Sequence, residues 1–313
     1  MKSILIGIPV LNNLEMTRAC LRHLVRNTAT DRTDLRIEIL ILDNGSTDDI
    51  ARLLRNEFSK SPFTIYYRRN PRNLGVAIAW NQILRFSADN IPSESMVYDY
   101  YVIASNDAFV CPDWLQPMVE SMESDRQIGW VAALENGSLF LDELIEAHAL
   151  SKNYRVAPEK PFDTAAIERS IDSIYSKWGG HDSFSRMVSN KGLPLFMPFR
   201  KTDRSAVCFM VRPSMVEQIG YFDEDEWPVG VAEDLEYYLR MEKIILPKGI
   251  TDEIYPDDKK WKSGFCGRSV VHHNWCSTHQ GKDFDGRMWG KMREKNWKKK
   301  FRKSKKYFNS LLP

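Results

Sequence analysis

The sequence predicts an α/β fold, with a mainly parallel sheet flanked by helices. The first ~135 residues alternate short β-rich runs with segments of helical period, the pattern that βα units produce. The chain has 313 residues, of which 43% are hydrophobic, so it can bury one substantial core with a smaller appended region. No stretch approaches the 18 consecutive apolar residues of a membrane span.

Five strands are expected in the first part of the chain, with helices filling the gaps. In the first gap, Asn12 is a candidate N-cap with Glu15 three residues later, and in the second gap Ser46 is a candidate cap ahead of an apolar helical face. The expected strands are residues 3–8, 36–42, 64–67, 100–104 and 129–133.

The rhythm is lost between residues 135 and 200, where prolines and glycines interrupt amphipathic pieces. A connection this long in a compact fold is usually functional or disordered, so we expect an elaborated insertion over a site. Regular structure is expected to return with a strand at 206–211, a helix at 233–242 and a strand that ends near Val271.

Charge is distributed unevenly along the chain. Residues 282–306 contain 12 Lys and Arg residues and three acidic residues, whereas the chain as a whole has a net charge of only +2. The body is therefore acidic and the tail strongly basic, which suggests an anionic partner for the tail.

Cysteine usage and the first apolar run bear on the compartment. The five cysteines are scattered and lack a C-x-x-C pair, which argues against a disulfide framework or a structural zinc site. The run from Ile4 to Val10 is too short for a signal sequence or a membrane span. We therefore expect a cytoplasmic protein without a transmembrane segment, whose membrane contact, if any, is peripheral.

Three common nucleotide and hydrolase motifs are missing from the sequence. It contains no G-x-x-x-x-G-K-[ST], no G-x-G-x-x-G after the first strand, and no G-x-S-x-G elbow. These absences argue against a P-loop enzyme, a dinucleotide-dependent enzyme and an α/β-hydrolase.

Two carboxylates follow predicted strands. Asp43 ends the second strand at the carboxyl edge of the sheet, where open α/β folds bind ligands. It could accept hydrogen bonds from a nucleobase or ribose, or it could simply make a tight turn with Gly45. Asp107 follows Ser105-Asn106 after the expected strand 100–104, where one carboxylate could hold a divalent ion that bridges two phosphates.

Further candidates are a basic turn, a pair of acids and a pair of histidines. Arg72, with Arg68 and Arg69, precedes a helix and could meet a diphosphate or be a solvated turn. Glu233-Asp234 begins a helix, where acids also stabilise the helix dipole. His272-His273 ends the last strand, and only one of the two can face a shared site because neighbouring strand residues point to opposite faces.

In order and content these segments resemble the large inverting family of GT-A-fold (Rossmann-like) glycosyltransferases called family 2. The resemblance covers nearly the whole chain except the insertion. The segments that carry it are Ile8-Pro9-Val10-Leu11-Asn12-Asn13, Asp43-Asn44-Gly45-Ser46-Thr47-Asp48, Asn70 to Gly75 with Asn81, Ser105-Asn106-Asp107, Gly220-Tyr221-Phe222-Asp223-Glu224, Glu233-Asp234-Leu235-Glu236 with Arg240, and His272 with Ser277-Thr278.

The resemblance implies an inverting transferase that moves a sugar from a nucleoside-diphosphate sugar to an acceptor hydroxyl with Mn²⁺ or Mg²⁺. Asp234 would be the general base, supported by Glu233. The metal would be held by Asp107 and by His272, with His273 in reserve. The nucleotide sugar would be bound by Pro9, Asp43, Arg72, Asn73, Gly75 and Asn106.

One departure from the family pattern bears on the metal. The first carboxylate of the D-x-D motif is Ser105 here, so the motif offers only Asp107 to a cation. We expect weaker metal affinity, with the ion held chiefly by the diphosphate. The same departure leaves open a non-catalytic GT-A domain that only binds a sugar nucleotide.

The acceptor is less constrained by the sequence. Trp178, His181, Asp182 and Trp227 are candidates for acceptor contact, although the tryptophans could equally be packing residues. A glycan or lipid-linked glycan is the first interpretation, with the tail docked to an anionic membrane. Modified bases of DNA, gripped by the tail, are the alternative, and a merely solvated tail is the third.

The resemblance also divides the chain. Residues 1–134 would form the nucleotide-sugar-binding half of the GT-A domain and residues 135–203 an insertion that caps the acceptor side. Residues 204–280 would form the catalytic and acceptor half, and residues 281–313 a basic helical tail.

Overall fold

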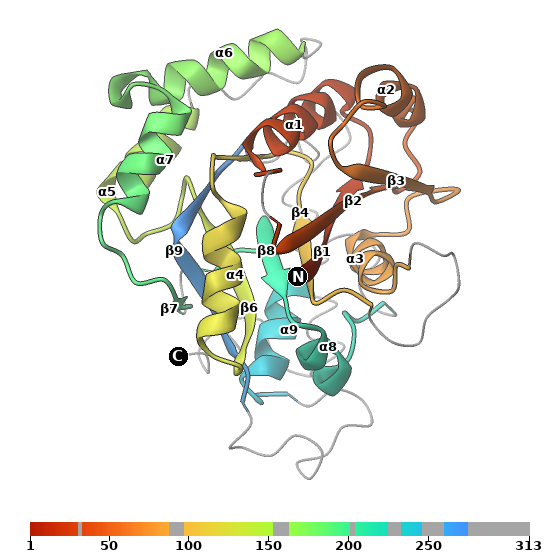
Figure 1. Ribbon diagram of the computed structural model, residues 1–313, viewed down its shortest axis with the longest axis vertical. Helices are drawn as coiled ribbons and strands as arrows, with labels where there is room; N and C mark the ends of the chain where they lie inside the picture. The colour runs from red at the N-terminus through yellow and green to blue at the C-terminus, as the bar shows by residue number, and fades with distance from the viewer. Residues whose placement is uncertain are drawn as a thin grey trace, which may run out of the picture.

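The computed structural model describes residues 1–30, 33–87, 97–152, 163–200, 204–224, 233–245 and 260–274. The basic tail, Trp227 and Ser277-Thr278 lie outside these residues. Within the described ranges the fold is mixed α/β, with one central sheet that is flanked by helices (Figure 1).

Among the described residues the sheet has nine strands, and its order along the main path is β3-β2-β1-β4-β8-β6-β9-β5, with β7 paired to β9. The bounds are β1 Lys2–Val10, β2 Leu35–Asp43, β3 Thr64–Arg69, β4 Tyr100–Ala104, β5 Ala108–Val110, β6 Ile128–Glu135, β7 Met197–Pro198, β8 Cys208–Val211 and β9 Lys262–His273.

The predicted parallel arrangement is confirmed for the first half of the sheet. Strands β1, β2, β3 and β4 are all joined by parallel pairings. Beyond β4 the sheet is mixed, because β8 runs antiparallel to both β4 and β6, while β6 and β9 are parallel. The carboxyl ends of β1, β2, β4, β6 and β9 therefore meet at one edge of the sheet, which is the edge on which the candidate site is built.

The helices are α1 Leu14–Asn27, α2 Ile50–Glu57, α3 Val76–Leu84, α4 Leu115–Ser124, α5 Asp142–Ser151, α6 Thr164–Tyr175, α7 His181–Ser189, α8 Pro213–Ile219 and α9 Glu233–Met241, with a 3-10 turn, η2, at Ser176–Trp178. Helices α3 and α9 share one face of the sheet. Phe209 of β8 contacts Trp80 of α3 and stacks on Trp130 of β6, which in turn contacts Tyr238 of α9.

The caps of the first helices differ from those expected. Helix α1 follows Asn13, a left-handed residue whose side chain makes no cap bond. The Leu14 amide donates instead to Asp48 Oδ2 at 2.9 Å, and Glu15 bonds to Thr164 of α6 rather than closing a capping box. Long-range partners have replaced the local cap because the two loops at the sheet edge lie against each other.

The second cap is also shifted along the chain. Asp49, not Ser46, caps α2, accepting from the Arg52 amide at 2.9 Å. Ser46 Oγ accepts from the Asn12 amide at 2.8 Å. Both polar residues that the sequence suggested as helix caps therefore tie the β1–α1 loop to the β2–α2 loop.

In the described residues between 135 and 200, namely 135–152 and 163–200, the chain forms the helices α5, α6 and α7. In Figure 1 these helices lie together at one side of the molecule, beside α1 and the end of β9. Helix α6 packs on α1, and α7 packs on β9. The insertion is therefore a helical layer, and its regular period was hidden in the sequence by the prolines and glycines between the helices.

In the described part of the chain no helix is long and apolar enough to cross a membrane.

Candidate functional site

Asp43 lies at the end of β2 and is 0% exposed. Its Oδ1 accepts from the Ser46 amide at 2.7 Å, and its Oδ2 accepts from the Tyr67 hydroxyl at 2.7 Å. The Arg69 guanidinium lies 3.7 Å from Oδ2. Burial, followed by the bond to Asp43, raises the pKa of Tyr67 to about 12, so this phenol stays a donor at neutral pH. Asp43 thus organises the turn through Ser46 and Tyr67. Its contact with a nucleobase or ribose stays a prediction.

Asn44, the next residue, joins the β2–α2 loop to the loop before α3. Its Nδ2 donates to Asn73 Oδ1 at 2.9 Å and its Oδ1 accepts from the Leu74 amide at 3.1 Å. Gly45, at φ 89°, lies so close to the second loop that a Cβ would stand 2.4 Å from the carbonyl carbon of Arg72. A side chain at this position would therefore push the two loops apart.

The other residues expected to bind the nucleotide sugar lie at the same edge of the sheet. Pro9 pairs with Leu42 near the end of β1, and Gly75, at φ 93°, is the N-cap of α3. Asn73 Oδ1 accepts from the Gly75 amide at 2.9 Å, and both Asn73 and Arg72 are exposed. The structure thus brings Pro9, Asp43, Arg72, Asn73 and Gly75 to one rim.

The other two arginines of the basic turn have structural partners. Arg68 stacks over the Phe86 ring at 4.6 Å, and Arg69 donates to the Ser46 carbonyl at 2.7 Å. Arg72 is therefore the arginine of this turn best placed to meet an anionic ligand.

Asp107 lies in the short connection between β4 and β5, beside the end of β9. His273 Nε2 lies 3.7 Å from Asp107 Oδ2, and the Asn274 amide donates to the Asp107 carbonyl at 3.0 Å. On its other side, His273 Nδ1 lies 2.9 Å from Glu135 Oε2 at the end of β6. Burial alone lowers the pKa of His273, but the charge of Asp107 and the bond to Glu135 outweigh it and raise the pKa.

His272, the first-choice metal partner in the sequence interpretation, lies on the opposite face of β9. It is 0% exposed, and its Nδ1 is 2.8 Å from the Tyr175 hydroxyl of α6. Burial, together with the charges of His273 and His23, lowers its pKa to about 3. The alternation of strand residues therefore brings the reserve residue, His273, to Asp107 and turns His272 away from it.

The residues that precede Asp107 are used by the fold. Asn106 is 6% exposed, and its Nδ2 donates to Thr17 Oγ1 of α1 at 3.1 Å. The Ser105 amide donates to the Val207 carbonyl at 2.8 Å. Asn106 thus anchors the Ser105–Asp107 loop on α1.

In α9, Asp234 is the only residue that is not buried. Burial, and then the charge of Asp234, raises the pKa of Tyr238 well above its usual value, and the charge of Glu135 acts in the same direction. The neighbouring Glu233 is 8% exposed.

The rest of the motif around Asp234 holds the helix in place. Glu236 and Arg240 form a buried bidentate pair, with Nε to Oε1 at 2.7 Å and Nη2 to Oε2 at 2.5 Å. Arg240 also donates to the Tyr221 carbonyl at 2.7 Å, and Tyr237 donates to the Gly220 carbonyl at 2.8 Å. The Gly220–Tyr221 segment and α9 are thereby locked together, which fixes the direction of the first turn that carries Asp234.

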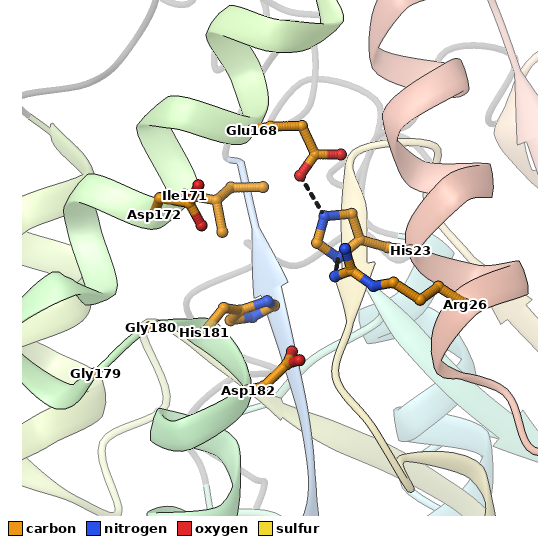
Figure 2. Close-up of a pocket in the computed structure, with 9 residues that line it drawn as sticks. All are labelled: His23, Arg26, Glu168, Ile171, Asp172, Gly179, Gly180, His181 and Asp182. Carbon is orange, nitrogen blue, oxygen red and sulfur yellow. Dashed lines mark hydrogen bonds and ion pairs between the residues drawn. The ribbon is translucent and has the colours of Figure 1, made fainter.

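Two acceptor candidates line a separate cavity of about 260 Å³ between α1, α6 and α7. Figure 2 shows His23 and Arg26 of α1 facing Glu168 of α6, with His181 and Asp182 of α7 below them. Along α1, Arg26 is nine residues beyond Thr17, the residue that Asn106 contacts, a rise of roughly 14 Å. This cavity is therefore distinct from the rim.

His181 and Trp178 pack within the helical layer. His181 is 5% exposed, its Nε2 lies 3.1 Å from Cys111 Sγ, and burial, followed by the charges of His272 and His23, lowers its pKa well below the usual value. Trp178 packs against Phe184 at 4.8 Å between ring centroids, with the Lys177 ammonium 4.5 Å from its ring. Trp227 lies outside the described residues.

The sequence reasoning missed two residues of the rim, Asn44 and Glu135. A signal for both was present. Asp43-Asn44-Gly45-Ser46 and Glu135-Asn136-Gly137-Ser138 are both an acid followed by Asn, Gly and Ser, and each stands at the carboxyl end of a strand. The second copy was not predicted as part of the site because β6 extends to Glu135, two residues beyond the expected strand end at 133.

In the described part of the chain, no group of three or more His, Cys, Asp and Glu side chains is arranged to hold a metal ion. The pair formed by Asp107 and His273 offers two ligands at most, so a cation there would need further ligands from a substrate or water.

Comparison with known structures gives likenesses of fold at low identity. The mannosyltransferase PcManGT from Pyrobaculum calidifontis, solved with GDP-Man and Mn²⁺, has a TM-score of 0.52 at 13% identity, covering 96% of this chain and 65% of that one. GalNAc-T7, solved with UDP, GalNAc and Mn²⁺, has a TM-score of 0.52 at 14% identity, covering 87% of this chain and 44% of that one. The chain thus spans under two thirds of either relative.

Comparison with curated protein sequences finds no match. The model of Glycosyl transferase family 2 matches residues 5–220, well over half of the chain and including β1, the Asp43 turn and Asp107. Together with the central sheet and its flanking helices, this match shows that the chain belongs to glycosyl transferase family 2 and has the GT-A fold.

Proposed function

We propose that this protein is a metal-dependent inverting glycosyltransferase that moves a sugar from a nucleoside-diphosphate sugar to an acceptor hydroxyl. The observation that carries the proposal is the meeting of Asp107 and His273 at the carboxyl edge of the sheet, with 3.7 Å between Oδ2 and Nε2. This edge also carries the Asp43 turn, so that a nucleotide and a cation would be neighbours.

The residues present fit a divalent cation that is shared with a diphosphate. One carboxylate and one imidazole suit Mn²⁺ better than Mg²⁺, which prefers oxygen ligands. The two structural relatives described above were both solved with Mn²⁺. When bound, the cation would neutralise charge that develops on the departing nucleoside diphosphate.

The donor would lie along the rim formed by Pro9, Asn73 and Gly75. The exposed Arg72 could pair with phosphate oxygens. Asp43 is fully buried and already accepts two hydrogen bonds, so its proposed contribution is to fix the turn against which the base lies, with Tyr67 as its partner.

Asp234 is proposed to remove the proton from the acceptor hydroxyl as that oxygen attacks the anomeric carbon. It is the one partly exposed residue of an otherwise buried helix, which suits a group that must reach substrate. A single displacement from the face opposite the leaving diphosphate inverts the anomeric configuration. Glu233 would support the base from the same turn.

For the acceptor, we propose a glycan or lipid-linked glycan. The cavity between α1, α6 and α7, with His181 and Asp182, could hold a remote part of a chain whose reacting end lies at Asp234. Cytoplasmic placement, with the basic tail docked on an anionic membrane surface, would fit such an acceptor. Modified DNA bases remain the alternative acceptor, to be separated from glycans by the assay below.

The test is a thermal-shift screen of nucleotide sugars with and without Mn²⁺, followed by an assay of nucleoside diphosphate release. We expect one donor to raise the melting temperature more with Mn²⁺ than without, since a ligand that binds the native state stabilises it. Release should then depend on an added acceptor, and glycan, lipid-linked glycan and duplex DNA form the three arms. Donor binding without release in any arm, or with water alone, would favour the non-catalytic binding domain instead.

A further inference from the structure

Glu135 lies at the end of β6 and is 7% exposed. A carboxylate this deeply buried costs free energy unless its lone pairs have partners. Its Oε2 lies 2.9 Å from His273 Nδ1. The partner of this buried carboxylate is therefore the His273 imidazole, whose other nitrogen lies near Asp107.

Asn136 holds the backbone of His273 from the same side. Its Oδ1 accepts from the His273 amide at 2.6 Å, and its Nδ2 donates to the His273 carbonyl at 3.2 Å. Glu135 and Asn136 together thus grip His273 at its ring, its amide and its carbonyl. A strand end that is clamped in this way has little freedom to rotate its imidazole.

The clamp also selects the tautomer of the ring. An ionised carboxylate can only accept, so the neutral imidazole must carry its proton on Nδ1 to bond with Glu135. The Nε2 lone pair then faces Asp107, whose Oδ2 is beyond hydrogen-bond distance at 3.7 Å. Nε2 of His273 and Oδ2 of Asp107 are therefore close enough together to be ligands of one ion.

We propose that Glu135 is a positioning residue for cation binding, which acts by orienting His273 and fixing its Nδ1–H tautomer. The inference rests on the function proposed above and names a residue that the D-x-D motif does not contain. The motif has lost its first carboxylate at Ser105. Glu135 makes up for that loss indirectly, because a ligand held in one orientation and one tautomer binds a cation more tightly.

A purely structural ion pair between Glu135 and His273 would predict something different. It would affect stability but leave Mn²⁺ affinity untouched once the protein is folded. The two roles are separated by measuring Mn²⁺ affinity, the tautomer of His273 and the melting temperature on the same set of variants.

The experiment titrates Mn²⁺ into the full chain, followed by electron paramagnetic resonance of the free ion, with UDP or GDP present. The variants are Glu135→Ala, Glu135→Gln, His273→Ala and the double variant Glu135→Ala/His273→Ala. Glu143→Gln is the control, since Glu143 is a partly exposed acid of α5 that pairs with Lys191. Melting temperatures confirm that each variant is folded.

We expect Glu135→Ala to weaken Mn²⁺ binding by roughly 10–100-fold, as for other residues that orient metal-binding histidines. Glu135→Gln, which can still accept from Nδ1, should lose less. The double variant should be no weaker than His273→Ala, because the two residues act as one unit. In ¹⁵N spectra without metal, His273 should hold the Nδ1–H tautomer in wild type and lose that preference in Glu135→Ala.

The outcomes that overturn the inference differ from those that overturn the proposed function. If His273→Ala weakens Mn²⁺ binding while Glu135→Ala binds like wild type, the positioning role is wrong and the metal pair stands. If His273→Ala itself leaves the affinity unchanged, the metal pair is wrong, and the role of Glu135 fails with it.

Discussion

His272 and His273 are adjacent in sequence and differ in almost every physical respect. His273 lies at the rim between Asp107 and Glu135, and those two carboxylates raise its pKa despite its burial. His272 faces the helical layer, where burial and neighbouring imidazoles lower its pKa to about 3. Strand β9 thus places His273 at a polar edge on one face of the sheet and His272 in a closed aromatic cluster on the opposite face.

The difference shows what the helices of residues 135–200 contribute. On their side of β9, Tyr175 contacts both His181 and His272, at ring-centroid distances of 4.7 Å and 5.4 Å. On the other side, His273 lies between the buried carboxylates of Asp107 and Glu135. We therefore expect changes at the rim to affect chemistry with little loss of stability, and changes in the aromatic cluster to do the reverse.

The largest effect is expected for Asp234→Asn at the rim. Loss of the proposed base should reduce transfer by about 10³-fold while donor binding stays intact, because proton removal matters only once the acceptor attacks. Transfer is measured as nucleoside diphosphate release with acceptor present. Asp142→Asn is the matched control, since Asp142 is also an acid in the first turn of a helix. Equal transfer rates in Asp234→Asn and wild type would show that Asp234 is not the general base.

A smaller effect is expected for Asp107→Ala. Removal of the one motif carboxylate should weaken Mn²⁺-dependent donor binding by roughly 10–100-fold, with the melting temperature of the ligand-free protein nearly unchanged. The shift in melting temperature that donor and Mn²⁺ produce together measures this. A variant that still gains the full Mn²⁺-dependent shift would show that the cation binds elsewhere.

The aromatic cluster should respond to pH instead. The folded-state pKa of His272 is about 3, below the ordinary unfolded value, so its stabilising contribution is complete above about pH 6.5. It is lost as pH falls from there toward 3, by about 2 kcal/mol at pH 5. His272→Gln should remove this component, so its melting temperature should fall less between pH 7 and 5 than that of wild type. Parallel pH profiles for the two proteins would contradict the assignment.

The smallest effect is expected at the cavity between α1 and α6. Glu168 Oε2 lies 2.9 Å from His23 Nε2, and its carboxylate is partly exposed. Glu168→Gln should cost about 0.5–1 kcal/mol of stability, seen in thermal melts, and leave transfer to short acceptors unchanged. A tenfold fall in transfer to short acceptors would instead place this cavity at the reacting end of the acceptor, and the division between the two sides of β9 would no longer hold.

Much of the fold was predictable because its signals are local. Strand periodicity predicted β1, β2, β3, β4 and β6 to within two residues at every end, and the strand-end position of Asp43 and Asp107 placed both at the rim. The helix caps were predicted wrongly. Asn12 and Ser46 are used between loops, because their partners became available only when those loops met.

The histidine pair marks the limit of prediction for the site. The alternation of side chains along a strand predicts that one of the two histidines faces the rim. Which of them does so depends on the register of β9 against β5 and β6. That register pairs Ala108 with His273 and Glu135 with Val271. Without it, the two residues are equivalent.

The sequence by itself determined the α/β class, the order of the family 2 segments and the carboxylates at the strand ends. These depend on periodicity and on the chemistry of short segments, which a single chain displays directly. Only the tertiary structure decided that His273 meets Asp107, that Glu135 holds it, and that Asp234 is the partly exposed acid of a buried helix. Those facts depend on strand register and on packing between segments more than a hundred residues apart, which no local pattern encodes.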